Sequence, residues 1–363
     1  MRVLHIETGK YLYGGALQVC HLIKGLSDQN IESILVCPRR SAIGRAMNGK
    51  VHVVELPVAG DLDITFFLGL LRTIRRTRPN IIHVHSRRGA DVWGGLAAGL
   101  ARVPAVITRR VDNPENRLAV RLKYAWYQRI ITISQGIHQV LQKEGIDGAR
   151  MSCIKSAVDH RVYENRCDRK WLETTFDIPP GARVIGIIAQ LIHRKGHRFL
   201  LSVIPRILAK HPDTFFLFLG QGPLLGELKA WHGHCKETSS RICFAGFRHD
   251  LARILPCLYM VVHPATMEGL GVSLLQAAAA GIPVIASRAG GIPEIVFHNK
   301  TGLLIEPGDI EALARAVISL LDDPVHAGKL GRAGRMHVQT NFSVDKMVSG
   351  NLSVYREMQV RHG

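Results

Sequence analysis

The sequence predicts an α/β fold with two domains, each built on a parallel sheet. Short buried strands alternate with amphipathic helices along most of the 363 residues, and this alternation is typical of a parallel sheet covered by helices on both faces. The alternation pauses once, over a polar segment from about Glu164 to Pro180. Because a chain of this length commonly holds about two domains, we place a linker near the start of that segment.

The first half begins directly with a strand. Strands are expected at residues 3–6, 31–37, 51–55, 81–85, 104–108, 130–133 and 151–155, because each is a short apolar run bounded by turn residues. Helices are expected at 16–27, 62–76, 90–101, 116–128 and 135–144, where apolar residues recur with helical spacing.

The second half repeats the alternation. Strands are expected at 184–189, 215–219, 242–244, 258–263, 284–286 and 303–305. Helices are expected at 197–210, 224–231, 251–257, 272–280 and 309–321, over much of the stretch that follows, and finally at about 345–359. Two open α/β halves of this kind bind ligands at the loops that follow the carboxyl ends of their strands.

The chain is strongly basic, with a net charge of +18 from 47 basic and 29 acidic residues. The basic residues are concentrated in the first half: Arg72, Arg75, Arg76, Arg78, Arg87, Arg88, Arg109, Arg110, Arg117, Arg121 and Lys123. Such an excess favours an anionic partner, which leaves nucleic acid, anionic lipid and a phosphorylated glycan as alternatives. No nucleic-acid motif is recognised, and 6% aromatic residues are few for stacking on bases, so no specific nucleic-acid partner is expected.

The sequence indicates a cytoplasmic protein. No window of 18 uncharged apolar residues exists, so no spanning helix is expected. The apolar run at the N-terminus is too short, before Glu7, for a signal peptide. The seven cysteines are scattered without a C-x-x-C pair, which favours reduced thiols over disulfides or a zinc site.

The stretch from Pro264 to Pro283 carries the most chemical information. It follows an apolar strand, turns through glycines 269 and 271, and continues as an apolar helix. A helix that opens from a glycine turn leaves its first N–H groups free to bind an anion. Glu268 lies at the turn and Gln276 lies eight positions later, inside the helix. A sugar nucleotide, with hydroxyls at one end and phosphates in the middle, would use all of these groups.

This stretch resembles the E-x7-E motif of retaining glycosyltransferases of family 4, which have the GT-B fold. The resemblance implies that Glu268 contacts the hydroxyls of the donor sugar and that Gln276, standing where a second Glu is usual, contacts the ribose. Gln can still accept a hydrogen bond from a ribose hydroxyl, but it lacks the charge. The motif residues Gly269, Leu270 and Gly271 are expected to bind the donor with them.

A second basic motif follows the strand at 184–189. The run from Ala189 to Gly196 resembles the family sequence G-R-L-x-x-x-K-G, in which Lys195 matches the lysine and Gln190 replaces the arginine. Cations and a helix N-terminus suit a departing diphosphate. We therefore expect Lys195 and Arg194 to act in catalysis, with Gln190 near the nucleotide.

Other turns resemble the family more weakly. Gly222 stands in a G-x-G-P turn, and Gly246 and Phe247 stand in a loop that lies against the base in the family, while Asp250 caps the helix after it. In the first half, Gly14 and Gly15 are expected to approach the donor phosphates, because glycine allows a close backbone approach.

The candidate acceptor-binding residues lie in the first half of the chain. His83 and His85 alternate along a strand end, so we expect them on opposite faces, with His85 nearer the site. Where the family often carries a histidine, this chain has Arg109 and Arg110, which would bind an anionic acceptor or the diphosphate. No D-x-D motif stands at a strand end, so neither a metal nor another cofactor is expected.

Together these observations predict a GT-B enzyme whose parallel sheets face each other across a cleft. The acceptor domain is expected at 1–165, completed by the helix at about 345–360, and the nucleotide-sugar domain at 166–344. The enzyme would transfer a hexose or hexosamine to a hydroxyl of a glycan or glycolipid, in lipopolysaccharide or other envelope polysaccharide synthesis at the inner membrane face. A nucleotide-sugar epimerase or a hydrolase of the same donor remains an alternative.

Overall fold

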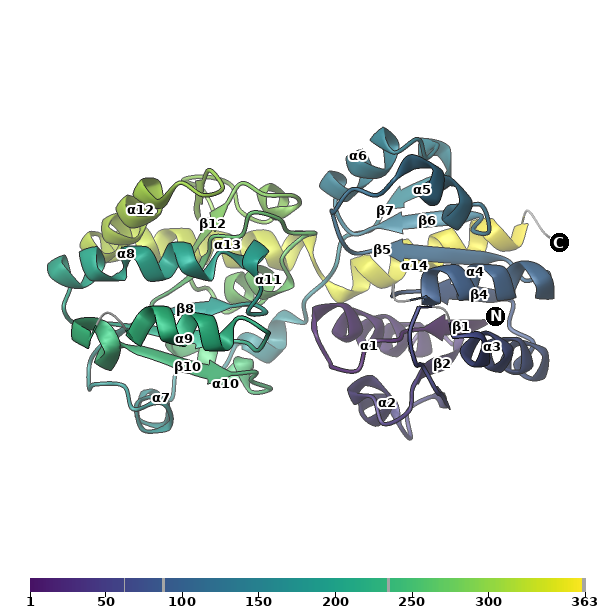
Figure 1. Ribbon diagram of the computed structural model, residues 1–363, viewed down its shortest axis with the longest axis horizontal. Helices are drawn as coiled ribbons and strands as arrows, with labels where there is room; N and C mark the ends of the chain where they lie inside the picture. Colours follow the sequence, from purple (N-terminus) through teal and green to yellow (C-terminus); the bar gives the residue numbers. More distant parts are fainter. Residues whose placement is uncertain (62, 87–88, 234–235, 361–363) are drawn as a thin grey trace. The chain divides into compact units, whose positions relative to one another are not determined.

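A computed structural model describes residues 1–61, 63–86, 89–233 and 236–360 of the chain (Figure 1). The expected helix start at Leu62, two of the basic residues, Arg87 and Arg88, and Cys235 lie outside the described residues. The chain divides into two compact units. The first is Met1–Ala157 together with the C-terminal segment from Val344, and the second is Val158–Ser343.

The first unit contains a seven-stranded parallel sheet of order β3-β2-β1-β4-β5-β6-β7. Its strands are β1 (Arg2–Ile6), β2 (Glu32–Pro38), β3 (His52–Leu56), β4 (Ile81–Val84), β5 (Ala105–Arg109), β6 (Arg129–Thr132) and β7 (Met151–Cys153). Strand β1 pairs with β2 on one side and β4 on the other, so the chain reverses its direction of winding beside β1. Ligands bind at such a switch point in open α/β sheets.

The helices of this unit form two layers. They are α1 (Gly14–Ser27), α2 (Ala42–Met47), α3 (Ile64–Thr77), α4 (Ala90–Ala101), α5 (Arg117–Tyr124), α6 (Gln135–Lys143) and α14 (Val344–Val360). Side chains alternate between the two faces of a strand: Leu4 packs with α3 and α4, whereas Val3 packs with α1 and α14. The C-terminal helix α14, yellow in Figure 1, thus completes the first unit.

The second unit contains a six-stranded parallel sheet of order β10-β9-β8-β11-β12-β13. Its strands are β8 (Arg183–Ile188), β9 (Thr214–Leu219), β10 (Ile242–Gly246), β11 (Met260–His263), β12 (Val284–Ser287) and β13 (Leu303–Ile305). Its helices are α7 (Arg169–Phe176), α8 (His197–Lys210), α9 (Leu225–Gly233), α10 (Leu251–Ile254), α11 (Val272–Ala279), α12 (Ile310–Asp322) and α13 (Pro324–Asn341). Strands β8 and β11 are neighbours although far apart in sequence, which brings their following loops together.

The segment after β7 differs from the expected linker. Tyr163 lies in a short 3₁₀ turn (His160–Tyr163) and accepts a hydrogen bond from Gln276, and Val158 N donates to Phe342 O, so this stretch packs in the second unit. The following polar residues form α7, whose first turn is capped by Asp168. The polarity that suggested a linker therefore belongs to the outer side of a short helix that buries Leu172 and Phe176.

The expectation that all cysteines are reduced is wrong for one pair. Cys167 and Cys257 form a disulfide across 90 residues of sequence, with their Cα atoms 4.7 Å apart. The sequence argument considered only closely spaced pairs, whereas packing within the second unit brings these two distant positions together. Among the described residues, no helix is both long and apolar enough to cross a membrane.

Candidate active site

The loop after β11 places Glu268 at the carboxyl edge of the second sheet. Pro264 follows the last strand residue, His263, and the chain then turns until Gly271, where φ is +99°, begins α11. A positive φ of this kind is strained for any residue with a side chain. No side chain caps the first turn of α11, an arrangement in which the first N–H groups of a helix can bind a ligand.

The loop after β8 packs directly onto this turn. It contains a short 3₁₀ turn (His193–Lys195) and then Gly196, where φ is +70° and an added Cβ would lie 1.9 Å from Pro264 O. Thr266 N donates a hydrogen bond of 2.9 Å to Arg194 O. The two loops therefore hold each other through their backbones, and only glycine fits at position 196.

These contacts bring Lys195 and Glu268 together. Lys195 Nζ lies 2.5 Å from Glu268 Oε2, and His263 Nε2 donates to the same oxygen over 2.8 Å. Gly269 N donates to the other carboxylate oxygen over 3.1 Å. Burial alone would raise the pKa of Glu268, but the Lys195 ammonium and the His263 hydrogen bond outweigh it and hold that pKa well below its usual range. The glutamate is therefore ionised at neutral pH.

The histidines near this pair are neutral. Burial lowers the pKa of His263, although the bond to Glu268 opposes the shift, and burial lowers the pKa of His197 to about 3. His263 thus orients the carboxylate as a neutral donor and adds no charge. The family motifs do not include His263; its position directly before Pro264, at the end of an expected strand, is the signal in the sequence that points to it.

Gln276 lies inside α11 and is buried. Its Nε2 donates a 2.7 Å hydrogen bond to Tyr163 OH, so the amide nitrogen is engaged within the domain and the carbonyl oxygen is the group left to accept from a ligand. A glutamate could not make this donation. Tyr163 is therefore a second residue that the motif analysis did not identify, because it lies far from the motif in sequence.

The glycine turns line the same edge for a packing reason. A Cβ at Gly222 would lie 2.4 Å from Leu191 O, and one at Gly220 would lie 1.8 Å from Ala189 O. The G-x-G turn after β9 thus fits against the backbone beside Gln190. Gly246, at a φ of +67°, has open space at its Cβ position.

The loop after β10 differs from expectation at one residue. Phe247 packs edge to face against His249. Asp250 does precede α10, but its side chain makes no capping hydrogen bond. It pairs instead with Arg248 at 2.5 Å, because the guanidinium offers two charged donors to the carboxylate.

In the first unit, Gly14 and Gly15 form the start of α1. No side chain caps this helix and no acidic residue lies in its first turn, which is the arrangement that favours an anion. An added Cβ at Gly15 would lie 3.4 Å from Arg110 Cδ. Burial lowers the pKa of Arg110 to about 10 against the opposing effect of Glu7, so this cation remains charged at neutral pH.

Arg109 has a different environment. Its guanidinium pairs with Glu115, and it donates to Val111 O at 2.9 Å and Asn113 O at 2.7 Å. The side chain is 2% exposed. These partners hold the loop after β5 together, so we remove Arg109 from the candidate acceptor-binding residues and retain Arg110.

The expectation that His83 and His85 point to opposite faces is wrong. Residues two apart on a strand lie on the same side, and the two ring centroids are 3.8 Å apart. His5 Nδ1 lies 3.0 Å from His85 Nε2, and His83 bonds to Tyr355 OH and Thr108 Oγ1 at 2.5 and 2.7 Å. Burial is the largest cause that lowers the pKa of each of the three histidines, so His85 faces Arg110 as a neutral ring.

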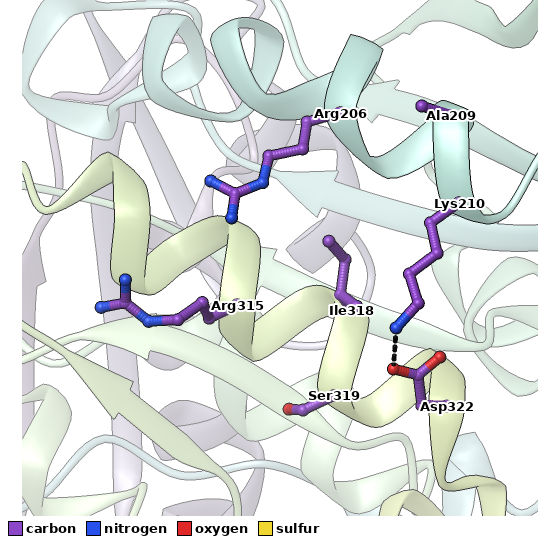
Figure 2. A pocket seen from close by; sticks show the side chains of 7 residues that line it. All are labelled: Arg206, Ala209, Lys210, Arg315, Ile318, Ser319 and Asp322. Atoms are coloured by element: carbon purple, nitrogen blue, oxygen red, sulfur yellow. Dashed lines mark hydrogen bonds and ion pairs between the residues drawn. The ribbon is translucent and has the colours of Figure 1, made fainter.

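A separate groove lies between α8 and α12 (Figure 2). It has a volume of about 590 Å³ and is lined by three basic residues, Arg206, Lys210 and Arg315, together with Asp322. Lys210 pairs with Asp322 at 2.5 Å, and Arg206 pairs with Glu311. Neither Lys195 nor Glu268 lines it, so this groove is not the site described above.

Comparisons with known proteins identify the family of the chain. A model described as "Glycosyl transferases group 1" matches residues 182–323, and one described as "Glycosyltransferase Family 4" matches residues 13–162. The glycogen synthase of Mycobacterium tuberculosis is 30% identical over 78% of this chain and 70% of its own length. A UDP-Gal:alpha-D-GlcNAc-diphosphoundecaprenol alpha-1,3-galactosyltransferase of Escherichia coli is 23% identical over 99% of this chain and 98% of that protein.

Solved structures share the fold over nearly the whole chain. Anabaena HepE in complex with UDP and glucose has a TM-score of 0.87 at 19% identity, covering 98% of this chain and 100% of that one. The lipopolysaccharide outer core galactosyltransferase WaaB has a TM-score of 0.72 at 14% identity, with the same coverage. The chain thus has the GT-B fold and belongs to the group 1 glycosyltransferases, family 4.

Proposed function

We propose that the protein transfers a hexose or hexosamine from a nucleoside-diphosphate sugar to a hydroxyl of a glycan or glycolipid, with retention at the anomeric carbon. The observation that carries this proposal is the contact between Lys195 Nζ and Glu268 Oε2 at 2.5 Å. A cation and an ionised carboxylate held together at a sheet edge suit a ligand whose phosphates and sugar hydroxyls are themselves adjacent. The relatives described above, among them a galactosyltransferase that uses UDP-Gal, a structure with bound UDP and a lipopolysaccharide outer core galactosyltransferase, support a sugar nucleotide and an envelope glycan.

Each group has a defined role in this proposal. The Glu268 carboxylate accepts hydrogen bonds from hydroxyls of the donor sugar, and its orientation is fixed by His263. Lys195 shifts from Glu268 toward the diphosphate as negative charge develops there, assisted by Arg194 and by the first N–H groups of α11. The Gln276 carbonyl accepts from the ribose. The loop residues Gln190, Gly222, Gly246 and Phe247 enclose the nucleotide.

The chemistry is a substitution at the anomeric carbon. The bond between that carbon and the diphosphate oxygen breaks, and the acceptor oxygen forms its bond on the same face. The acceptor proton passes to the departing phosphate oxygen, because no carboxylate other than Glu268 is assigned to the site and Glu268 is held by its hydrogen bonds. Binding energy then acts through orientation and through stabilisation of the leaving charge.

We further propose that the reaction needs no metal ion and no other cofactor, because Lys195 and Arg194 supply the positive charge that a divalent ion would supply. Within the described ranges, the group of side chains arranged to hold a metal is His5, His83 and His85, and these rings are already joined to one another and to their neighbours. Addition of a chelator should leave the rate unchanged within about twofold.

In the first unit, Gly14, Gly15 and Arg110 would bind phosphate or an anionic acceptor, with His85 beside them. The net charge of +18 suits an acceptor in lipopolysaccharide or another envelope polysaccharide, presented at the cytoplasmic face of the inner membrane.

The test combines donor binding with product analysis. Thermal shifts with UDP, GDP, ADP and CMP sugars should single out one base, and incubation of that donor with lipopolysaccharide core acceptors should give a product whose anomeric configuration, read by NMR, equals that of the donor. Release of free sugar at the same rate with and without acceptor would instead identify a hydrolase, and conversion of the donor into its epimer would identify an epimerase. Either result would overturn the proposal.

A further inference from the structure

Exposed apolar side chains gather on one helical layer of the first unit. The large apolar side chains exposed on α3, α4, α5 and the short segment after α5 are Ile64, Leu68, Val92, Leu100, Leu118, Leu122 and Trp126. Leu118 and Leu122, one turn apart on α5, are 66% and 64% exposed. Because the inner sides of these helices pack on the sheet, the exposed side chains face outward. We call this surface the α3–α5 layer.

The layer is continuous across its three helices. Phe67 of α3 packs on Trp93 of α4 with ring centroids 5.2 Å apart. Trp126 lies over two of the three glycines of α4, because a Cβ at Gly95 or Gly99 would come within 2.9 or 2.5 Å of it. The small glycines allow the indole to fill the space between α4 and α5, while 44% of it stays exposed. The apolar residues thus form one broad surface.

Arginines are interleaved with these apolar residues. Exposed arginines of the layer are Arg72, Arg75, Arg76, Arg102, Arg117 and Arg121. None of these six arginines forms an ion pair with another described residue. The neighbouring acids have other partners: Glu115 pairs with Arg109 and Lys123, and Asp91 also pairs with Lys123. Asp63 caps α3. The layer therefore presents uncompensated positive charge.

The opposite face of the same sheet has a different surface. The outer side of α14 carries polar residues, among them Asp345, Ser349, Ser353 and Arg356, and its one exposed large apolar residue is the terminal Val360. Since both faces belong to the same fold, packing of the domain does not require exposed leucines on α5. Their placement on one side points to a partner that contacts this side only.

From this combination we infer that the α3–α5 layer docks the protein onto an anionic lipid bilayer. On α5, Arg117 precedes Leu118 and Arg121 precedes Leu122, so aliphatic tips and guanidinium groups project together along the helix, as in helices that lie in the interface of a membrane. Leucine tips enter the acyl boundary while arginines remain at the phosphates. The charge on the layer is complementary to phospholipid headgroups.

This inference deepens the proposed function, because a glycolipid acceptor would be reached from the same bilayer. It does not depend on transfer activity, since lipid binding is measured without a donor. Each arginine near an anionic surface should strengthen binding by about fivefold, and this electrostatic part should fall as salt is raised.

The experiment is co-sedimentation of the full chain with vesicles of phosphatidylcholine, with and without phosphatidylglycerol. The wild type should bind the anionic vesicles, with binding reduced at high salt. Leu118→Ser with Leu122→Ser, and separately Arg117→Glu with Arg121→Glu, should each lower the partition coefficient at least about tenfold. The matched control is Arg356→Glu on α14, which makes the same kind of charge change on the opposite face and should bind like wild type.

Outcomes that overturn the inference are equally defined. The inference fails if both α5 variants bind vesicles as well as the wild type does, or if binding does not depend on lipid charge. It also fails if the α5 variants lose self-association of the protein and not lipid binding, or if the wild type binds nucleic acid and not vesicles. Folding of each variant is checked by its thermal melt. With a water-soluble acceptor the α5 variants should transfer sugar at the wild-type rate. Vesicle binding without any transfer would remove the proposed function and leave the docking surface standing.

Discussion

The two domains place very different electrostatics at the same edge of their sheets. In the second domain, Lys195, Glu268 and His263 converge within 2.8 Å contacts and two of the three carry full charge. In the first domain, His5, His83 and His85 cluster at the ends of β1 and β4, and all three are neutral, so that Arg110 carries the charge of that group. The domain that carries the family motifs thus holds paired charges, and the other holds one cation against neutral rings.

This difference indicates which domain should tolerate substitutions in its site residues. Opposite charges that fix each other leave little freedom for substitution, because removing one leaves a buried charge without its partner. In a neutral cluster around one arginine, a histidine can be replaced by another hydrogen-bond acceptor without leaving a buried charge unpaired. We therefore expect the largest mutational effects in the second domain and smaller ones in the first, and the following predictions test this order.

The largest effect is expected for Glu268→Gln. The amide keeps the shape but loses the charge that accepts from the sugar hydroxyls and balances Lys195, so kcat should fall about 10²–10³-fold, measured by transfer from the preferred donor. Asp322→Asn is the matched control, because Asp322 also pairs with a lysine at 2.5 Å but in an exposed position. A fully active Glu268→Gln enzyme would remove Glu268 from the site.

Lys195→Met comes next. Loss of the ammonium should weaken binding of the free nucleoside diphosphate and lower kcat about 10²-fold, because both depend on the charge at the phosphates. Calorimetric titration with the diphosphate separates the two effects. Lys210→Met, which breaks the exposed pair of the same length, should change neither quantity. Unchanged diphosphate affinity in Lys195→Met would contradict the assigned role.

The neighbouring arginines of the first domain should behave in opposite ways. Arg110→Met should lower kcat/KM about tenfold and leave the melting temperature nearly unchanged. Arg109→Met should cost about 3 kcal/mol of unfolding free energy, because the carbonyls of Val111 and Asn113 lose their charged donor and Glu115 loses one cationic partner and keeps Lys123, while kcat per folded enzyme stays the same. If Arg109→Met lost activity without losing stability, our structural assignment of Arg109 would be wrong.

Acid should weaken the second domain through Glu268. Its folded pKa lies below the unfolded value of about 4.3, so its contribution to stability is complete above the unfolded pKa and is lost as pH falls through the folded pKa. Urea melts from pH 7 to pH 3 should therefore show a smaller loss of unfolding free energy in Glu268→Gln than in wild type. Parallel curves for the two proteins would contradict the depressed pKa.

The smallest effect is expected for Gln276→Glu, which restores the residue usual in the family. Tyr163 OH would then donate to the carboxylate in place of accepting from the amide, so donor KM should change by no more than about threefold. Gln276→Leu, which removes the ribose acceptor, should raise KM more. Equal kinetics for Leu and Gln would show that the ribose is held elsewhere.

Much of the architecture could be predicted from the sequence. The expected helices at 90–101 and 197–210 coincide with α4 and α8, because strong apolar spacing and glycine or proline boundaries mark both. The helices α2 and α7 were not expected, since α2 is only one to two turns long and α7 follows a polar stretch whose exposure resembles a linker. The spacing of apolar residues identifies a helix or strand only where that spacing is regular over several residues.

The site could be predicted in part. Motif spacing brought Glu268 and Lys195 into one hypothesis, and the structure brings them into contact. It did not include His263, although the position of this residue directly before Pro264 was a usable signal. It could not supply Tyr163, which joins the site only because the chain returns past α11. The arginine pair at 109–110 shows the same limit, since two adjacent identical residues have opposite surroundings once the loop after β5 is folded.

The contacts at Gly196, Gly220 and Gly222 have a practical consequence for redesign. At each of these positions another strand-end loop occupies the volume that a methyl group would need. The backbone of the proposed donor site is thus fixed by contacts between its loops, and no single loop can shift alone. Changes of sugar or base preference are better sought at partly exposed residues such as Gln190 and Arg194, with the three glycines kept.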